Sequence, residues 1–176
     1  TSDLPLAALR QLIERRYGAD AVDEPRTGLS VSLISFAFPA GLPREADMVL
    51  DARFLRNPHY DPQLRPRTGS DPEVAAYVAD DPDFPAFFQQ ITALLALVLP
   101  RFVQEGKKYA TIAVGCTGGR HRSVTIVERL ASHLLDSGWR VSTSHRELAR
   151  ESTLARADLR RVAVPATATS EPHGIP

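Results

Sequence analysis

The sequence predicts an α/β fold, a three-layer-like sandwich with a mainly parallel sheet flanked by helices. Short apolar, β-branched runs typical of buried strands alternate along the chain with longer segments of helical periodicity. The clearest example is 109–135, where an apolar run, a glycine-rich turn and a helical segment follow one another. The chain has 176 residues, 43% of them apolar, which is enough for one domain core.

The first expected element is a helix over residues 1–18, because helix start signals precede an apolar stripe that ends at Gly18. Residues 20–28 are polar and contain Pro25, which is typical of a linker. We therefore assign residues 1–28 to the end of an upstream domain and place the start of the present domain at residue 29.

Three further strands are expected. Residues 30–38 alternate between small polar and apolar side chains before turning fully apolar, and 48–51 form a second short apolar run. Residues 139–143 have the composition of another strand. A loop over 52–62 follows the second strand and is rich in charge and proline, which is typical of a loop that carries function on a rigid scaffold.

Two helices are expected between the second and third strands. Asp71 and Pro72 open a short helix, and a longer one runs over about 84–105. The longer helix is apolar on most faces, so we expect it to be the helix most deeply packed against the sheet. Pro100 interrupts its most apolar part, and from this we expect no membrane-spanning segment.

The C-terminal region is expected to hold one more helix and then a flexible tail. Residues 144–147 fit a capping box, in which a serine and a glutamate satisfy each other's backbone N–H groups at a helix start. Apolar periodicity fades afterwards, so the domain is expected to end at 151 and the tail to occupy 152–176.

Composition limits the function classes. Lys plus Arg and Asp plus Glu both number 21, so the chain is not a globally basic nucleic-acid binder, and phosphate recognition must come from local clusters. A single cysteine excludes an internal disulfide and a multi-cysteine zinc site, and no metal site is expected. This cysteine usage fits a reducing, cytoplasmic location.

The turn at 115–123 carries the chemistry. Gly118 and Gly119 allow backbone conformations that aim successive N–H groups at one point, and the following helix adds unpaired donors there. Arg122 adds a planar fork suited to phosphate oxygens. The turn is not an ATP-type phosphate loop, because Arg120 stands five residues after Gly115, where that motif requires its second glycine, and the turn contains no lysine. The pattern predicts a site for a phosphate-sized anion.

A catalytic alternative arises from the spacing of Cys116, five residues, then Arg122 and Ser123. This spacing resembles cysteine-dependent phosphatases, in which Cys116 would be the nucleophile and Asp61, or else His59, the general acid. Tyrosine phosphatases usually have histidine where this chain has Gly115. A structural alternative also exists, in which Cys116 is only a small buried apolar residue.

Other polar residues near the motifs have structural alternatives. Arg53 and Arg56 would pair with Asp51 and Asp47 at the surface, an alternative that we favour for Arg56. His121 either caps the helix or contacts the ligand. His145 is expected to be structural.

Three motifs resemble a known family when taken together. They are GCTGGRHRS at 115–123, DARFLRNPHY at 51–60 and LRPRTG at 64–69. In this order they closely resemble the C-terminal domain of RapZ, the RNase adapter protein family that includes YvcJ, from about residue 29 to 150. Residues 1–18 look like the closing helix of that family's N-terminal P-loop domain, which binds ATP or GTP.

The resemblance implies a non-catalytic regulatory domain that binds glucosamine-6-phosphate and a small regulatory RNA, which it presents to an endoribonuclease. It implies no cofactor in this domain, ATP or GTP only with the N-terminal domain, no membrane, and a homo-oligomer. Carried over by motif, and with Arg53 added from the loop, the ligand-binding residues are His59, Cys116, Thr117, Gly118, Gly119, His121, Arg122 and Arg53. Cys116 then forms a wall of the site.

RNA contacts are expected from arginines beyond the central helix. They are Arg140, Arg146 and Arg150, with Arg156, Arg160 and Arg161 further along. The alternative is that Arg140 and Arg146, like Arg129, lie on solvated faces.

Overall fold

The computed structural model describes residues 28–153, and its centre is a parallel sheet of four strands in the order β2-β3-β1-β4. β1 spans Ser30–Ala37, β2 Met48–Asp51, β3 Tyr109–Cys116 and β4 Arg140–His145. All three strand pairings are parallel, and β1 and β3 are the inner strands. The predicted α/β sandwich with a mainly parallel sheet is confirmed.

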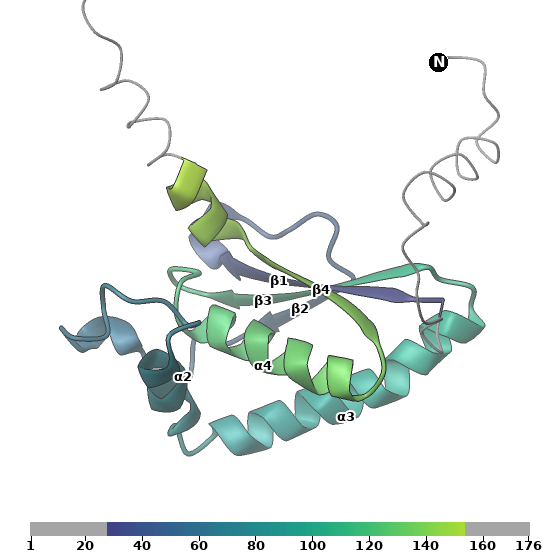
Figure 1. The fold of residues 1–176 in the computed structure, drawn as a ribbon, viewed down its shortest axis with the longest axis horizontal. Coiled ribbons are helices and arrows are strands. Elements are labelled where there is room, and N and C mark those ends of the chain that lie inside the picture. The colour runs from purple at the N-terminus through teal and green to yellow at the C-terminus, as the bar shows by residue number, and fades with distance from the viewer. Residues whose placement is uncertain (1–27, 154–176) are drawn as a thin grey trace, which may run out of the picture.

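Three helices lie on one face of this sheet (Figure 1). They are α2, Pro72–Ala79, α3, Phe84–Gln104, and α4, Arg122–Asp136. The steps from β2 to β3 and from β3 to β4 run in the same direction across the sheet, so right-handed connections place α3 and α4 on the same face. The step from β1 to β2 runs the other way, and its connection covers the opposite face.

The main core lies between the sheet and the helices. It combines Val31 and Leu33 of β1 and Ile112 of β3 with the inner faces of α3 and α4. Between β1, β4 and α4, the His145 ring contacts Ser35 Oγ through Nδ1, 2.9 Å away, and Glu128 Oε1 through Nε2, 2.7 Å away. The structural role expected for His145 agrees with these contacts.

A second, smaller core lies on the opposite face of the sheet. Phe36 is buried there, and Phe38 packs beside it from the short 3-10 helix η1, Phe38–Ala40. A Cβ on Gly115 would lie 2.5 Å from the Phe38 ring and 2.6 Å from the Phe36 ring. Packing of these two rings therefore requires glycine immediately before Cys116.

Two expectations about element ends need correction. β3 continues through Cys116, so the turn proper begins at Thr117. The capping box is wrong, because Ser144 lies in β4 and the helix begins at residue 146. Glu147 instead accepts a hydrogen bond from the backbone N–H of Ala37, 3.0 Å away, because the helix packs against the end of β1.

The expectation that α3 is the most deeply packed helix is also wrong. Four residues of α3 are buried, against nine of α4. α3 contacts the core through one stripe, and Leu97 on its outer face is 65% exposed. α4 is packed more deeply because it lies directly over β1, β3 and β4.

α3 continues through Pro100 and is long and apolar enough, by length and composition, to cross a membrane. The assumption that Pro100 ends the apolar segment is therefore wrong. The same test is passed by core helices of soluble proteins, and α3 buries Leu95 and Leu99 within this fold. The helix therefore does not by itself indicate a membrane protein.

Some expectations concern residues outside 28–153. These are the helix over 1–18, most of the linker, and the tail from 154 onward, which contains Arg156, Arg160 and Arg161. Ser152 and Thr153, the first residues of the expected tail, are still helical.

The packing of α3 predicts a contrast between two leucines. Leu95→Ala should lower the free energy of unfolding by about 2 to 5 kcal/mol, because its fully buried side chain would leave a cavity. Leu97→Ala should change it by about 0.5 kcal/mol or less, since Leu97 faces solvent. Urea titrations of both variants measure this, and equal losses would contradict the assigned face.

Candidate functional site

The candidate site lies at the carboxyl edge of the sheet, where the parallel strands end together (Figure 1). The loop after β2 and the turn between β3 and α4 meet there. Open parallel sheets commonly bind ligands at this edge. The backbone N–H of Ala52 donates to the Gly115 carbonyl, 2.9 Å away, and so joins the two segments at their start.

The turn closes over Cys116. The Gly119 N–H donates to Cys116 Sγ, and Ser123 Oγ lies within hydrogen-bond distance of the same sulfur, each at 3.2 Å. Gly119 has a φ of +65°, which favours glycine. Cys116 is only 2% exposed, so it forms the floor of the turn.

Gly118 differs from Gly119 in its surroundings. A Cβ on Gly118 would meet nothing within 4 Å, whereas a Cβ on Gly119 would lie 2.6 Å from Glu147 Oε2 and 2.9 Å from the Ala37 nitrogen. Thr117 and Gly118 are exposed. The rim of the turn is therefore open to solvent at Thr117 and Gly118, and its back is closed by Glu147.

Arg122, the first residue of α4, joins the turn to the loop after β2. Its Nη1 donates to the carbonyls of Arg53, at 2.6 Å, and Leu55, at 3.1 Å, and its Nη2 donates to Thr117 Oγ1 at 3.2 Å. The residue is only 4% exposed. Its Nε is buried and has no hydrogen-bond partner among residues 28–153. One N–H of this guanidinium is therefore left for another acceptor.

His121 is anchored to the third motif. Its Nε2 donates to the Arg65 carbonyl, 3.2 Å away, and no side-chain hydrogen bond caps α4. The Gly69 N–H donates to the Arg120 carbonyl at 2.8 Å, and a Cβ on Gly69 would collide with the His121 carbonyl. Residues 64–69 therefore pack directly against the turn, and the capping alternative for His121 does not hold.

Burial is the main cause that lowers the pKa of His121 below its ordinary value of 6.5. Hydrogen bonds with the backbone of Arg67 and Arg65 raise this pKa, and the charge of Arg120 and that of His59 lower it. Both histidines contact Arg65: the His59 carbonyl accepts from Arg65 Nε, and the Arg65 carbonyl accepts from His121 Nε2.

The loop after β2 holds its arginines in ion pairs. Arg53 pairs with Asp51 at 2.6 Å, as the structural alternative expects, and its guanidinium lies 4.1 Å from the centre of the Phe38 ring. Arg53 thus contributes its backbone carbonyl to Arg122, while its side chain is directed to Asp51. Arg56 pairs with Asp80, not with Asp47.

Asp47 has a different partner from the one expected. It contacts Lys107 Nζ, 2.5 Å away, and accepts the N–H of Thr111. The expected pair failed because Asp47 lies beside the start of β3, whereas Arg56 lies beyond the carboxyl end of β2. Ion pairs between distant segments depend on the fold and cannot be derived from spacing along the chain.

His59 and Asp61 belong to the second part of this loop, around the 3-10 helix η2, Pro58–Tyr60. His59 is exposed, its N–H donates to Asn57 Oδ1, and its carbonyl accepts from Arg65 Nε at 2.8 Å. Asp61 Oδ1 accepts the N–H of Gln63 at 2.8 Å.

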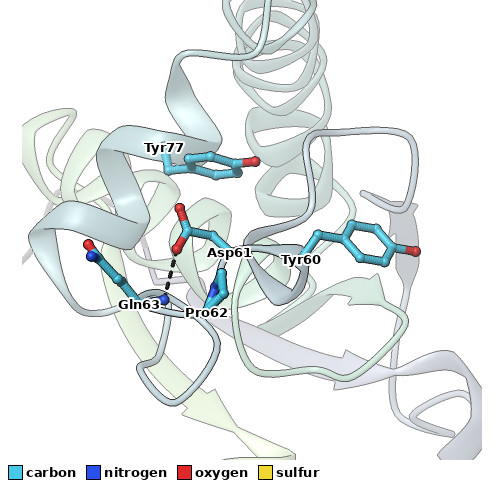
Figure 2. Close-up of a pocket in the computed structure, with 5 residues that line it drawn as sticks. All are labelled: Tyr60, Asp61, Pro62, Gln63 and Tyr77. Atoms are coloured by element: carbon cyan, nitrogen blue, oxygen red, sulfur yellow. Dashed lines mark hydrogen bonds between the residues drawn. The ribbon is translucent and has the colours of Figure 1, made fainter.

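Asp61 lines a shallow pocket of about 560 Å³ together with Tyr60, Pro62, Gln63 and Tyr77 (Figure 2). The Tyr77 ring forms one side of it, and Asp61, Pro62 and Gln63 form the other. No residue of the 115–123 turn lines this pocket. Cys116 and Asp61, the acid of the phosphatase alternative, are therefore not brought into one pocket.

Of the arginines assigned to RNA, the three that lie within residues 28–153 do not form one patch. Arg140 begins β4, and Arg146 follows the end of that strand, so about 20 Å of extended chain separates them. Arg146 donates to the carbonyls of Ala37 and Gly41, which rules out the solvated face proposed for it. Arg140 and Arg150 are exposed.

Sequence reasoning missed three contributors to the site, namely Arg65, Gly69 and Glu147. The first two lie in the LRPRTG motif, which signalled the region but not its contacts. Within the described residues no group of three or more His, Cys, Asp or Glu side chains is placed to hold a metal ion.

Comparison with known proteins identifies a family over the region that contains the three motifs. A family model described as the RapZ C-terminal domain matches residues 29–149. The chain belongs to this family. The match covers all four strands and α2, α3 and α4, and it contains the turn, the loop after β2 and the 64–69 segment. The resemblance seen in the sequence is therefore confirmed.

Curated relatives of this RapZ C-terminal domain carry the name nucleotide-binding protein. One from Granulibacter bethesdensis is 61% identical over 162 residues, which cover 92% of this chain and 49% of the relative. One from Gluconobacter oxydans is 63% identical over 153 residues, 86% of this chain and 46% of the relative. The chain spans about half the length of these relatives.

The lowered pKa of His121 predicts a loss of stability in mild acid. Above pH 6.5 the residue is neutral in both folded and unfolded chains; below it, the unfolded chain binds the proton first. The free energy of unfolding should therefore fall as the pH is lowered through 6.5 toward the lower pKa of His121 in the folded chain. Urea titrations at a series of pH values should show a smaller fall in the free energy of unfolding for His121→Gln than for wild type. In the control His133→Gln, which removes an exposed histidine, the fall should match wild type; a flat wild-type profile would contradict the prediction.

Proposed function

We propose that this domain binds the phosphate group of a phosphorylated amino sugar, glucosamine-6-phosphate, at the turn formed by residues 117–122. In this role it is the sensor part of a RapZ-like regulatory protein and has no catalytic activity of its own. The observation that carries the proposal is the buried Nε of Arg122, which has no partner among the described residues.

An unsatisfied buried N–H costs roughly 1 to 3 kcal/mol, so an acceptor that reaches it gains binding energy. Nε and Nη2 form one edge of the planar guanidinium, and such an edge suits two oxygens of a phosphate. Nη2 already lies at Thr117 Oγ1, on the open rim of the turn. The start of α4 adds further donors and a partial positive charge there.

His59 and His121 supply the rest of the site in this proposal. Arg65 connects them, because its Nε donates to the His59 carbonyl and its own carbonyl accepts from His121 Nε2 within the turn. His121 is held by the Arg65 carbonyl, so its ring is fixed before a ligand arrives. The choice of an amino sugar rests on the family, because the turn itself recognises only the phosphate.

The remaining family properties are carried over as proposals. The full-length protein binds ATP or GTP through its other half, acts in the cytoplasm as a homo-oligomer, and presents a small regulatory RNA to an endoribonuclease. The name nucleotide-binding protein of the relatives agrees with the first of these. For RNA, Arg140 and Arg150 are the exposed charges, since Arg146 is engaged with backbone carbonyls.

Gly118→Ala tests the anion site without disturbing the fold. A methyl group there meets no protein atom within 4 Å and stands at the open rim, where it would obstruct a ligand. We expect calorimetry to show glucosamine-6-phosphate binding to wild type and affinity at least about tenfold lower, some 1.4 kcal/mol, in the variant. Gly28→Ala is the matched control and should bind as wild type. No binding to wild type, or equal binding to Gly118→Ala, would refute the site.

One observation favours a hydrolase as the second candidate, namely the Gly119 N–H that donates to Cys116 Sγ within the phosphatase-type spacing. The sensor proposal expects no release of phosphate from p-nitrophenyl phosphate across acidic to neutral pH. Turnover that wild type shows and Cys116→Ser loses would establish the hydrolase instead.

A further inference from the structure

A helical segment at residues 146–153 places two carboxylates against the anion turn. It follows β4 at the carboxyl edge of the sheet (Figure 1). Glu147 and Glu151 are four residues apart, so they lie on the same face of this helix. That face is turned toward a site that we propose to bind an anion, which is an unfavourable arrangement of like charges.

Glu147 closes the back of the turn. Its Oε2 accepts the Ala37 N–H at 3.0 Å and would lie 2.6 Å from a Cβ on Gly119, so it touches that glycine. Its Oε1 accepts from Arg146 Nε at 3.1 Å and lies 3.6 Å from Arg150 Nη1. Its side chain is only 14% exposed, which limits screening of its charge by solvent.

Glu151 engages the remaining cation of the turn. Its Oε1 lies 2.5 Å from Arg120 Nη1. Arg120 sits between Gly119 and His121, and its charge contributes to lowering the pKa of His121, so its field reaches the site. While this ion pair holds, the guanidinium of Arg120 is directed to a carboxylate of its own chain.

We propose that the helix at 146–153 is an autoinhibitory contact, in which Glu151 withholds Arg120 from the anion that binds the turn. This inference rests on the proposed function of the turn. Docking of the helix lowers the affinity for the anion, and the anion in turn weakens docking of the helix, because coupling between two binding events is reciprocal. The regulated element is thus the segment that carries Arg146 and Arg150.

Glu151→Gln tests the contact, because it removes one negative charge at a half-exposed position and should leave the fold intact. We expect calorimetry with inorganic phosphate to show an affinity about threefold higher in the variant, the scale of one exposed ion pair. Glu105→Gln is the matched control. It removes the same charge at the end of α3, just before β3 starts and so at the opposite edge of the sheet, and should bind as wild type.

A second experiment uses Arg120→Gln, which removes the cation that Glu151 contacts. In this background Glu151→Gln should no longer raise the affinity for phosphate, because the ion pair is already absent. A third readout follows the helix itself, since saturating phosphate should speed amide hydrogen exchange at residues 146–153 of wild type.

The outcomes separate the two proposals. Phosphate binding to neither wild type nor Glu151→Gln refutes the anion site, and the inference with it. Binding to both with equal affinity, or weaker binding to Glu151→Gln, leaves the site in place and overturns the autoinhibitory contact. Tighter binding that persists in the Arg120→Gln background also overturns it.

Discussion

The buried guanidinium of Arg122 is the interaction on which the site depends. Three of its hydrogen bonds reach two carbonyls of the loop after β2 and one hydroxyl of the turn after β3. Those segments are far apart in sequence, and the guanidinium fixes the distance between them. Because a buried arginine must satisfy its donors, the loop cannot move away without leaving them unpaired. The position of the loop that carries His59 is therefore set by the same residue whose Nε has no hydrogen-bond partner among residues 28–153.

Much of this architecture could be predicted from local patterns. β-branched runs placed the four strands, helix starts at aspartate and proline placed α2 and α3, and helical periodicity after the glycine turn placed α4, since these patterns depend on neighbours in the chain. The turn could be found for the same reason. Gly118, Gly119 and Arg122 lie within five residues, and their combination has few explanations other than an anion site. Three motifs then identified the family before any contact was known.

What could not be predicted depends on contacts between distant segments. Composition made α3 look like the central helix, but it does not say which face is covered, and Leu97 is exposed. Glu147 looked like the partner of Ser144, because the spacing of a capping box is local, whereas its actual partner, Ala37, is 110 residues away. Asp47 and Lys107 pair across 60 residues of sequence. Such contacts arise only once the sheet order is fixed.

The position of α4 determines which part of the site can unfold locally. The turn lies between β3, one of the two inner strands, and α4, which has the most buried residues of the helices within residues 28–153. Segments with this much buried apolar contact belong to the most stable cooperative unit of a domain and open only when the whole domain unfolds. We therefore expect the floor of the site to unfold only together with the whole domain. The loop after β2 has more exposed residues, and exposed loop positions tolerate substitution, so variation in ligand preference is most easily accommodated there, on the side of His59.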